Sequence, residues 1–594
     1  MTGIQGKRAL TPASSGEESS HMFDNSWKSI GSANSRLAGA IAVFVLSPLA
    51  FLGTLSALGV SLVSVPAQVQ AAPPKEEFST GLSDRVVQFV DMQIAQGWTD
   101  NEVTPSAVAS DAEWIRRVYL DLVGHIPPAA KVEAFVEDNA HDKRSRLIDD
   151  LLSDPDYVRN FTEVWTNVLI GRNAPRLTSR AGMRKFLRES IARNRPWNDI
   201  VYDLLTAEGH YEENGAANFI LAQLDGNPNS EEYHVEATAK SARIFLGLQV
   251  QCTQCHNHPF NDWKQNQFWE FNSFFRQARR VNHRKYDPKA MQEVDDYAEL
   301  VYRDFSGPVY YENRGGLVQV AYPTYLGNEI PRDASDRREE LAKLICKTDP
   351  EHQLARAYVN RMWGYFTGYG FTRPMDDMGP HNPPSHPEIL DRLTEEFVNR
   401  GYDMKQLARW ICNTRAYNLT SQFNPKNDFD NPAAGEVPLF SHMYVKTMQA
   451  EQLYDSLLIA TSADGSGSNP TGGEQERERW LRDFLRIFGG NEEEEPTMFS
   501  GSIPQALLMM NGALVQKAIS SDSGSYVHTV LSSPKYRSDI DRMSAFYLAA
   551  LGRRPERYEI SQFQKLARAE RDPVRAYQDL YWALLNSNEF IVNH

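Results

Sequence analysis

The feature that most restricts the fold of this chain is a helical spacing of apolar residues that recurs near both of its ends. Residues 119–135 carry Tyr119, Leu120, Gly124, Pro127 and Phe135, and residues 547–563 repeat Tyr, Leu, Gly, Pro and Phe in the same register. Apolar residues three and four apart predict a helix, and the Gly and Pro predict a turn after it. Each segment is therefore expected to form a helix–turn–helix in which the Tyr and the Phe pack together.

Similar spacing continues through most of residues 79–280 and again from about residue 334 to the end, which predicts a mainly α fold. Between these parts, residues 309–320 contain two short β-favouring runs around Gly315 and Gly316, which predict a hairpin. We expect two helical lobes, residues 78–284 and 334–594, joined by a small β-hairpin insertion within residues 285–333.

The N-terminal residues 1–72 contain an apolar run without charge over residues 37–64, longer than the roughly 20 residues that cross a membrane. Val69, Gln70 and Ala71 resemble the small-residue cleavage site of a signal peptide. Both a cleaved signal peptide and an uncleaved membrane anchor fit this segment. Either interpretation predicts export to the periplasm or cell envelope, with membrane contact only through an uncleaved segment.

Cys252, Cys255 and His256 form the C-x-x-C-H pattern that attaches a c-type haem. The two thiols bond to the porphyrin, and the adjacent imidazole binds the iron as proximal ligand. With four Cys and fourteen His in 594 residues, the pattern arises by chance with a probability on the order of 1 in 2000. The motif therefore predicts haem c.

Three other interpretations of the motif remain open. A C-x-x-C pair can be a small disulfide or a thiol redox pair. Zinc would use Cys252, Cys255, His256 and His258, although structural zinc sites usually draw their ligands from two separated segments. A structural role without any cofactor is the third interpretation.

A proline-rich loop at residues 374–387 is a second candidate for function, because it gathers polar side chains on a stiff backbone. It carries Asp376, Asp377, Met378, His381 and His386. Met378, His381 or His386, or His258 beside the motif, are candidates for the distal haem ligand. The same loop is alternatively a second metal site, a group that orients water for hydrolysis, or a rigid turn that caps neighbouring helices.

The net charge of -15 argues against general affinity for nucleic acid or anionic membranes. Four cysteines are too few for a disulfide scaffold, and their spacing does not decide whether Cys346 and Cys412 pair.

Several motifs together carry a resemblance to known families. Residues 117–122 and 245–260 resemble the planctomycete cytochrome-c-like domain of unknown function, which would correspond to residues 78–284. Residues 357–364, 376–383, 411–417 and 504–507 resemble its planctomycete-specific C-terminal companion, which would correspond to residues 334–594. The resemblance implies an exported protein with a C-x-x-C-H motif and no established activity.

These features give two hypotheses from different classes. The first is an exported c-type haem protein that transfers electrons to or from a redox partner protein. The second is a haem-free exported binding or hydrolytic protein that uses the loop from Asp376 to His386, with the C-x-x-C-H motif as a structural disulfide or metal site.

Overall fold

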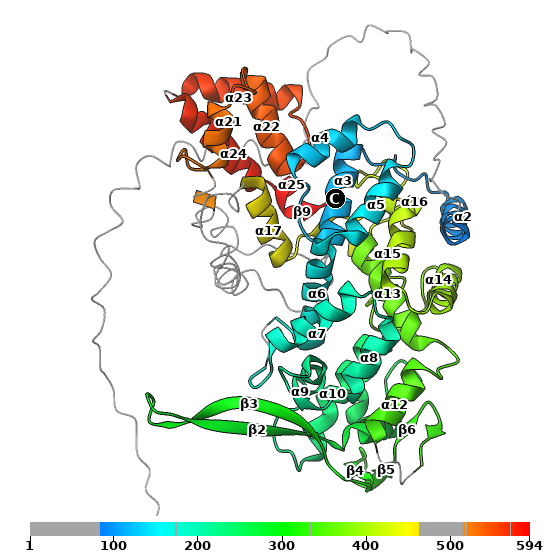
Figure 1. Ribbon diagram of the computed structural model, residues 1–594. Coiled ribbons are helices and arrows are strands. Elements are labelled where there is room, and N and C mark those ends of the chain that lie inside the picture. Colours follow the sequence, from blue (N-terminus) through cyan, green and yellow to red (C-terminus); the bar gives the residue numbers. More distant parts are fainter. Residues whose placement is uncertain (1–83, 173–174, 332–335, 462–514, 517–518, 571) are drawn as a thin grey trace, which may run out of the picture. The chain divides into compact units, whose positions relative to one another are not determined.

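The computed structural model describes residues 84–594 except residues 173–174, 332–335, 462–514, 517–518 and 571 (Figure 1). The predicted signal peptide or anchor at residues 1–72 and the resemblance at residues 504–507 lie outside these described residues. No helix in the described part of the chain is both long and apolar enough to cross a membrane.

Helices dominate the described residues, which confirms the mainly α prediction. Those before the β segment are α2 (Arg85–Asp100), α3 (Asp111–Val123), α4 (Ala129–Glu137), α5 (Lys143–Ser153), α6 (Pro155–Ile170), α7 (Arg180–Ala192), α8 (Trp197–Thr206), α9 (Asn218–Leu221), α10 (Val235–Phe245) and α11 (Gln265–Asn272). Those after it are α12 (Arg337–Cys346), α13 (Gln353–Thr367), α14 (Pro387–Asn399), α15 (Met404–Asn413), α16 (Arg415–Asn418), α17 (Ala450–Thr461), α21 (Tyr526–Ser532), α22 (Asp539–Leu551), α23 (Arg557–Ala569), α24 (Pro573–Leu585) and α25 (Asn588–Ile591).

The strands form small antiparallel sheets. The predicted hairpin is present as β4 (Val309–Glu312) and β5 (Val318–Ala321), and shorter pairs are formed by β6 (Thr324–Tyr325) with β7 (Asn328–Glu329) and by β8 (Lys446–Thr447) with β9 (Val592–Asn593). The largest sheet joins β1 (Gly209–His210), β2 (Ala278–Asp287) and β3 (Gln292–Tyr302), and it begins earlier than the predicted β segment.

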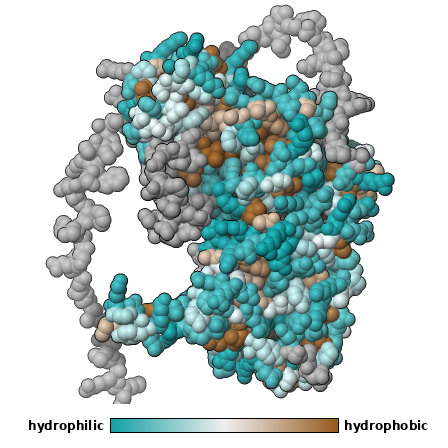
Figure 2. Space-filling view, viewed as in Figure 1, coloured by the Kyte–Doolittle hydropathy of each residue, from teal (hydrophilic) through white to brown (hydrophobic). Residues whose placement is uncertain are grey.

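Strands β2 and β3 form a long ribbon whose visible surface is mostly hydrophilic (Figures 1 and 2). Basic side chains on β2 pair with acidic ones on β3, as in Lys285 with Asp296 at 2.8 Å and His283 with Glu299 at 3.0 Å. The sequence gives no strand signal here because charged residues fill both faces, so the apolar–polar alternation of a half-buried strand is missing.

Helix α3 connects two hydrophobic cores. Trp114, Ile115 and Leu122 belong to a core that continues on both sides of the β segment, mainly up to Tyr444, and that also includes Leu548. Leu120 of the same helix belongs to a second core made mainly by α17 and α21–α25. The apolar packing is therefore continuous across residues 285–333 rather than divided there.

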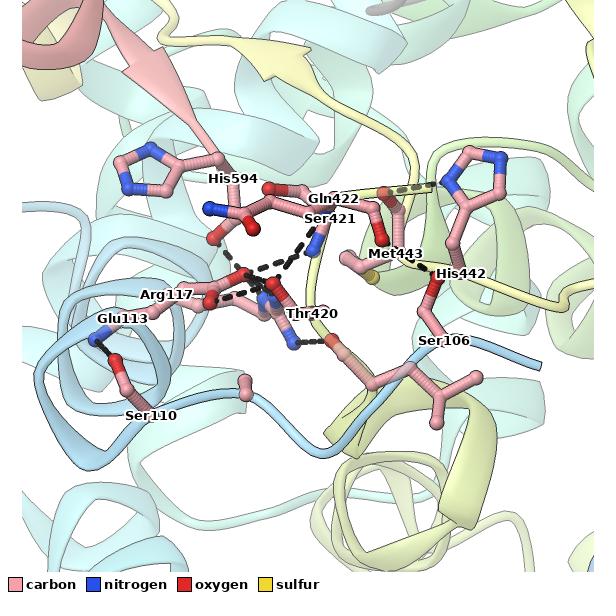
Figure 3. A network of polar contacts seen from close by, with 12 residues as sticks. Ser106, Ser110, Glu113, Arg117, Thr420, Ser421, Gln422, His442, Met443 and His594 are labelled. Carbon is pink, nitrogen blue, oxygen red and sulfur yellow. Dashed lines mark hydrogen bonds and ion pairs between the residues drawn. The ribbon is translucent and has the colours of Figure 1, made fainter. Parts of the chain in front are cut away.

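Buried charges on α3 tie distant segments together. Glu113 accepts hydrogen bonds from Arg117, from the Thr420 hydroxyl and from the Ser421 amide, and the Arg117 Nε atom donates to the His594 carbonyl at 3.1 Å (Figure 3). Buried charges are stable only when paired and hydrogen-bonded, so each of these contacts fixes the position of a segment against α3.

The predicted internal repeat is present, with a helix–turn–helix in each copy. Helices α3 and α22 begin after Ser110 and Ser538, whose hydroxyls cap the amides of Glu113 and Asp541. Both helices end at a left-handed glycine, Gly124 with φ 78° and Gly552 with φ 70°. Helices α4 and α23 follow, as the repeat predicts.

The contacts inside the two copies also correspond. In the first copy His125 pairs with Asp156, and Arg553 pairs with Glu589 at the equivalent positions of the second. In the first copy the Arg144 guanidinium lies over the Trp114 ring. In the second copy Arg542 stands at the position of Trp114 and lies over Tyr577, which stands at the position of Arg144. The cation and the aromatic ring are thus exchanged between the two positions.

The predicted Tyr–Phe stack differs from the observed packing. Phe135 stacks on Trp114 with ring centroids 5.5 Å apart, and Phe563 packs on Tyr577 at 5.0 Å. In each copy the Phe ring packs against the aromatic member of the cation–aromatic pair. Because that aromatic residue stands at a different position in each copy, the residue spacing within one copy could not reveal it.

Gly124→Ala is expected to destabilise the protein more than Gly552→Ala. Both residues are left-handed, which costs a side chain about 1–2 kcal/mol. A Cβ at residue 124 would also lie 2.6 Å from Asn160 Oδ1, whereas the nearest atom at residue 552 is 3.8 Å away. We expect a loss of about 2–4 kcal/mol for Gly124→Ala, measured by urea unfolding; equal losses for the two variants would contradict it.

Candidate functional site

The C-x-x-C-H motif begins on a short 3₁₀ turn, η4 (Gln251–Gln254), with Cys255 as the residue that ends the turn and His256 directly after it. The two residues between the cysteines anchor the turn. Buried Thr253 donates to the Val250 carbonyl at 2.5 Å, and the Gln254 carbonyl accepts from Gln265 Nε2 and Trp269 Nε1, both at 3.1 Å. Because residues three apart align on a 3₁₀ turn, Cys252 and Cys255 lie on the same side.

Both motif thiols are exposed and free, whereas Cys346 and Cys412 are buried. The pKa of Cys252 is raised, mainly by partial burial and also by the negative charge of Asp377. A thiol redox enzyme depends on a lowered cysteine pKa, so this environment does not favour that alternative.

The ring of His256 is oriented by a hydrogen bond between its Nδ1 atom and the Asn257 carbonyl at 2.7 Å. A carbonyl only accepts, so Nδ1 carries the proton and Nε2 keeps its lone pair. Metal-binding histidines have this arrangement, in which a backbone carbonyl fixes the tautomer. Two aligned exposed thiols and an imidazole with a free Nε2 lone pair fit the attachment of haem c.

The proline-rich loop docks directly beside the motif. The Met378 amide donates to the Gly247 carbonyl at 2.7 Å, and Gln249 Nε2 donates to Asp376 Oδ1 at 2.9 Å. Arg243 lies 3.8 Å from the same carboxylate. Two stretches more than 100 residues apart in the sequence therefore form one site.

Three side chains of this site interact next to the motif. His381 Nε2 lies 2.9 Å from Asp377 Oδ2, and the His381 ring is 5.5 Å from the ring of His258. A Cβ at residue 379 would lie only 2.6 Å from His381 Nδ1, so Gly379 is required for the close approach of the backbone to this ring.

Two other predicted site residues have different surroundings. The Met378 sulfur packs against Gly247, where an added Cβ would lie 2.8 Å from it. His386 packs against Phe371 and Phe440, with ring centroids 6.2 and 5.3 Å away, and burial lowers its pKa to about 4. The contacts of His386 are thus with the helical core and not with the motif.

The aromatic side chains after the motif divide into two groups. Phe260 is 76% exposed, whereas the rings of Phe268, Phe271, Phe274 and Phe275 are buried in the core. Trp269 stacks on Tyr311 of β4, and Gln265 Nε2 also donates to the Glu312 carbonyl at 3.0 Å. Gln265 and the β4–β5 hairpin thus support the motif turn, although nothing in the sequence marks them as part of the site.

Among the residues that the structure describes, no three His, Cys, Asp or Glu side chains are arranged to hold a metal ion. The zinc interpretation with Cys252, Cys255, His256 and His258 therefore gains no support from the geometry.

Gly247→Ala is expected to separate the loop from the motif. Residue 247 has φ 63°, and the new Cβ would lie 2.8 Å from the Met378 sulfur. We expect the Met378 amide to exchange its hydrogen about tenfold faster or more, measured by mass spectrometry. The control is Gly226→Ala, which has φ 82° and no atom within 4 Å; the same acceleration at Met378 in both variants would contradict the prediction.

Two families match the chain. The first is described as "Protein of unknown function (DUF1549)" and matches residues 89–280, which include the C-x-x-C-H motif. The second is described as "Protein of unknown function (DUF1553)" and matches residues 337–567, which include the proline-rich loop. Neither description names a cytochrome. No curated protein and no solved structure matches the chain. The chain therefore contains two planctomycete-type domains of unknown function, and each contributes one half of the site.

Proposed function

We propose that this protein is an exported c-type haem protein that exchanges single electrons with a redox partner protein. The observation that carries the proposal is the geometry of the motif: Cys252 and Cys255 lie exposed on one side of an anchored turn, and His256 has Nε2 free for iron. The two thiols would hold the porphyrin through thioether bonds, with His256 as proximal ligand.

The residues around the motif prepare it for this role. The hydrogen bonds of the Thr253 hydroxyl and of the Gln254 carbonyl fix the turn, so the two thiols keep their spacing before any group is attached. The Asn257 carbonyl accepts the Nδ1 proton of His256 and so orients the ring as an iron ligand. A bound haem supplies a ferric–ferrous couple that takes or gives one electron.

Exposed apolar side chains beside the motif support a surface for electron exchange. Phe260 is 76% exposed, and the outer face of the β4–β5 hairpin carries exposed Tyr310, Val318 and Val320. Weak redox complexes bury small surfaces with an apolar centre, which this face provides. The net charge of -15 supports a protein partner rather than nucleic acid.

Export supports the same proposal, because c-type haem is attached outside the cytoplasmic membrane. The uncharged apolar run at residues 37–64 is the sequence feature that predicts export.

One specific observation supports a second candidate function, that of a haem-free binding or hydrolytic protein. The Asp377–His381 pair at 2.9 Å is an oriented imidazole of the kind used in general base catalysis. However, His381 Nδ1, the nitrogen that would take up a proton, is buried and without a hydrogen-bond partner. This favours the haem proposal over hydrolysis by this pair.

The absorption spectrum of the protein made together with a haem c maturation system tests the proposal. We expect a Soret band that survives denaturation and extraction with acidic acetone, because thioether bonds do not dissociate. A folded protein without such a band would contradict haem attachment and leave the haem-free candidate.

A further inference from the structure

We infer that, among the residues that the structure describes, His256 is the one axial iron ligand that this site provides, and that the opposite axial position would take small external ligands such as carbon monoxide or cyanide. This inference rests on the proposed haem attachment. It comes from the hydrogen bonds and the packing of the other four candidate ligands, His258, Met378, His381 and His386.

His258 is held in the tautomer that cannot bind iron through Nε2. Its Nδ1 atom accepts backbone hydrogen bonds from Phe260 at 3.2 Å and from Asn261 at 3.0 Å. Nδ1 is therefore unprotonated, and the ring proton lies on Nε2. Its own amide donates to the Trp263 carbonyl at 2.8 Å, so the backbone of the same short loop also holds the residue in place.

His381 is held in the same tautomer as His258, with the ring proton on Nε2. Its Nε2 proton is donated to Asp377, and the lone pair on Nδ1 lies beneath Gly379, without exposure to solvent. An iron ion could reach Nδ1 only if residues 379–381 changed their backbone conformation. Asn382 opposes that change, since its Nδ2 atom donates to the carbonyls of Arg373 at 3.0 Å and of Asp377 at 2.8 Å.

Met378 and His386 are committed to packing. The Met378 sulfur fills the space over Gly247, and its amide is bonded to the Gly247 carbonyl. His386 lies between Phe371 and Phe440 and shares a hydrogen bond with Ser385. Using either side chain as a ligand would require undocking the loop that completes the site.

The experiment uses the haem-loaded full chain, with carbon monoxide as probe for the reduced form and cyanide for the oxidised form. We expect a high-spin spectrum and a shift of the Soret band on addition of either probe. The variants His258→Ala and His381→Ala should keep both the high-spin spectrum and the carbon monoxide shift, since neither ring is on the iron.

Each other outcome is informative. A low-spin protein that becomes high-spin in His258→Ala or His381→Ala would show that this histidine is an axial ligand and overturn the inference. A low-spin protein that neither variant changes would place the sixth ligand elsewhere in the chain and also overturn it. Both results would leave haem attachment intact, whereas a protein without bound haem would overturn the proposed function as well.

Discussion

Replacing Lys446 with Met is expected to lower the free energy of unfolding by about 3–5 kcal/mol, because it leaves the Asp121 carboxylate buried without its counter-ion. Lys446 Nζ donates to Asp121 Oδ1 at 2.7 Å and to the carbonyls of Tyr365 at 2.9 Å and Phe366 at 2.8 Å. Three donated bonds use all the protons of an ammonium group, so the lysine is charged.

Asp121 is the matching buried anion at the junction of the two cores. It accepts from Lys446, from the Tyr417 hydroxyl at 2.8 Å and from Asn593 Nδ2 at 2.7 Å, and all three neighbours are donors. Burial raises the pKa of Asp121, and the charge of Lys446 opposes that rise. Removal of Lys446 therefore leaves a buried carboxylate without its ion-pair partner.

Urea unfolding measures this loss, with Arg146→Ala as the control. Arg146 pairs with Asp138 on the surface, where the two side chains are 54% and 39% exposed, so its removal should cost at most about 1 kcal/mol. The double variant Asp121→Asn with Lys446→Met should lose less stability than the sum of the two single variants, because neither charge remains unpaired. A Lys446→Met protein as stable as the Arg146→Ala protein would contradict a charged buried pair.

The second large effect is the loss of all covalently bound haem when Cys252 and Cys255 are both replaced by Ser. Both thiols are exposed and free, so the double variant should fold with unchanged stability. Each single variant should retain haem through one thioether bond, with a shifted spectrum. The change is measured as the Soret absorbance that remains with the protein after acidic acetone extraction.

Cys346→Ala is the control for the thiol variants, because Cys346 is a buried cysteine in α12 and has no part in the motif. It should keep all of the bound haem. Haem that stays covalently attached in the double Ser variant would show that the motif is not the attachment site.

The sequence could predict the elements that depend on local patterns. Helical spacing identified α3, α4, α22 and α23, and the glycines that end α3 and α22 have the left-handed conformation that this position requires. The hairpin of β4 and β5 followed from β-favouring runs around two glycines. These features are encoded within a few residues, so one sequence is enough to recognise them.

Features that depend on distant partners could not be predicted. The sequence selected both the motif and the proline-rich loop, but only contacts across the fold, such as those of Met378 with Gly247 and of Asp376 with Gln249, show that they form one site. The tautomers of His256, His258 and His381 depend on which backbone groups surround each ring, which residue spacing does not reveal. Likewise, the burial of Arg117 and Asp121 on α3 depends on partners about 300 residues away.

The most direct test of haem attachment is mass spectrometry of the tryptic peptide that contains the motif. Cleavage after Arg243 and Lys264 gives residues 244–264, which include Cys252 and Cys255 but no internal Lys or Arg. We predict that this peptide, from protein made with a haem c maturation system, carries one haem bonded to both sulfur atoms. The same peptide recovered from folded protein with two unmodified thiols, or with a disulfide between them, would contradict the proposed function.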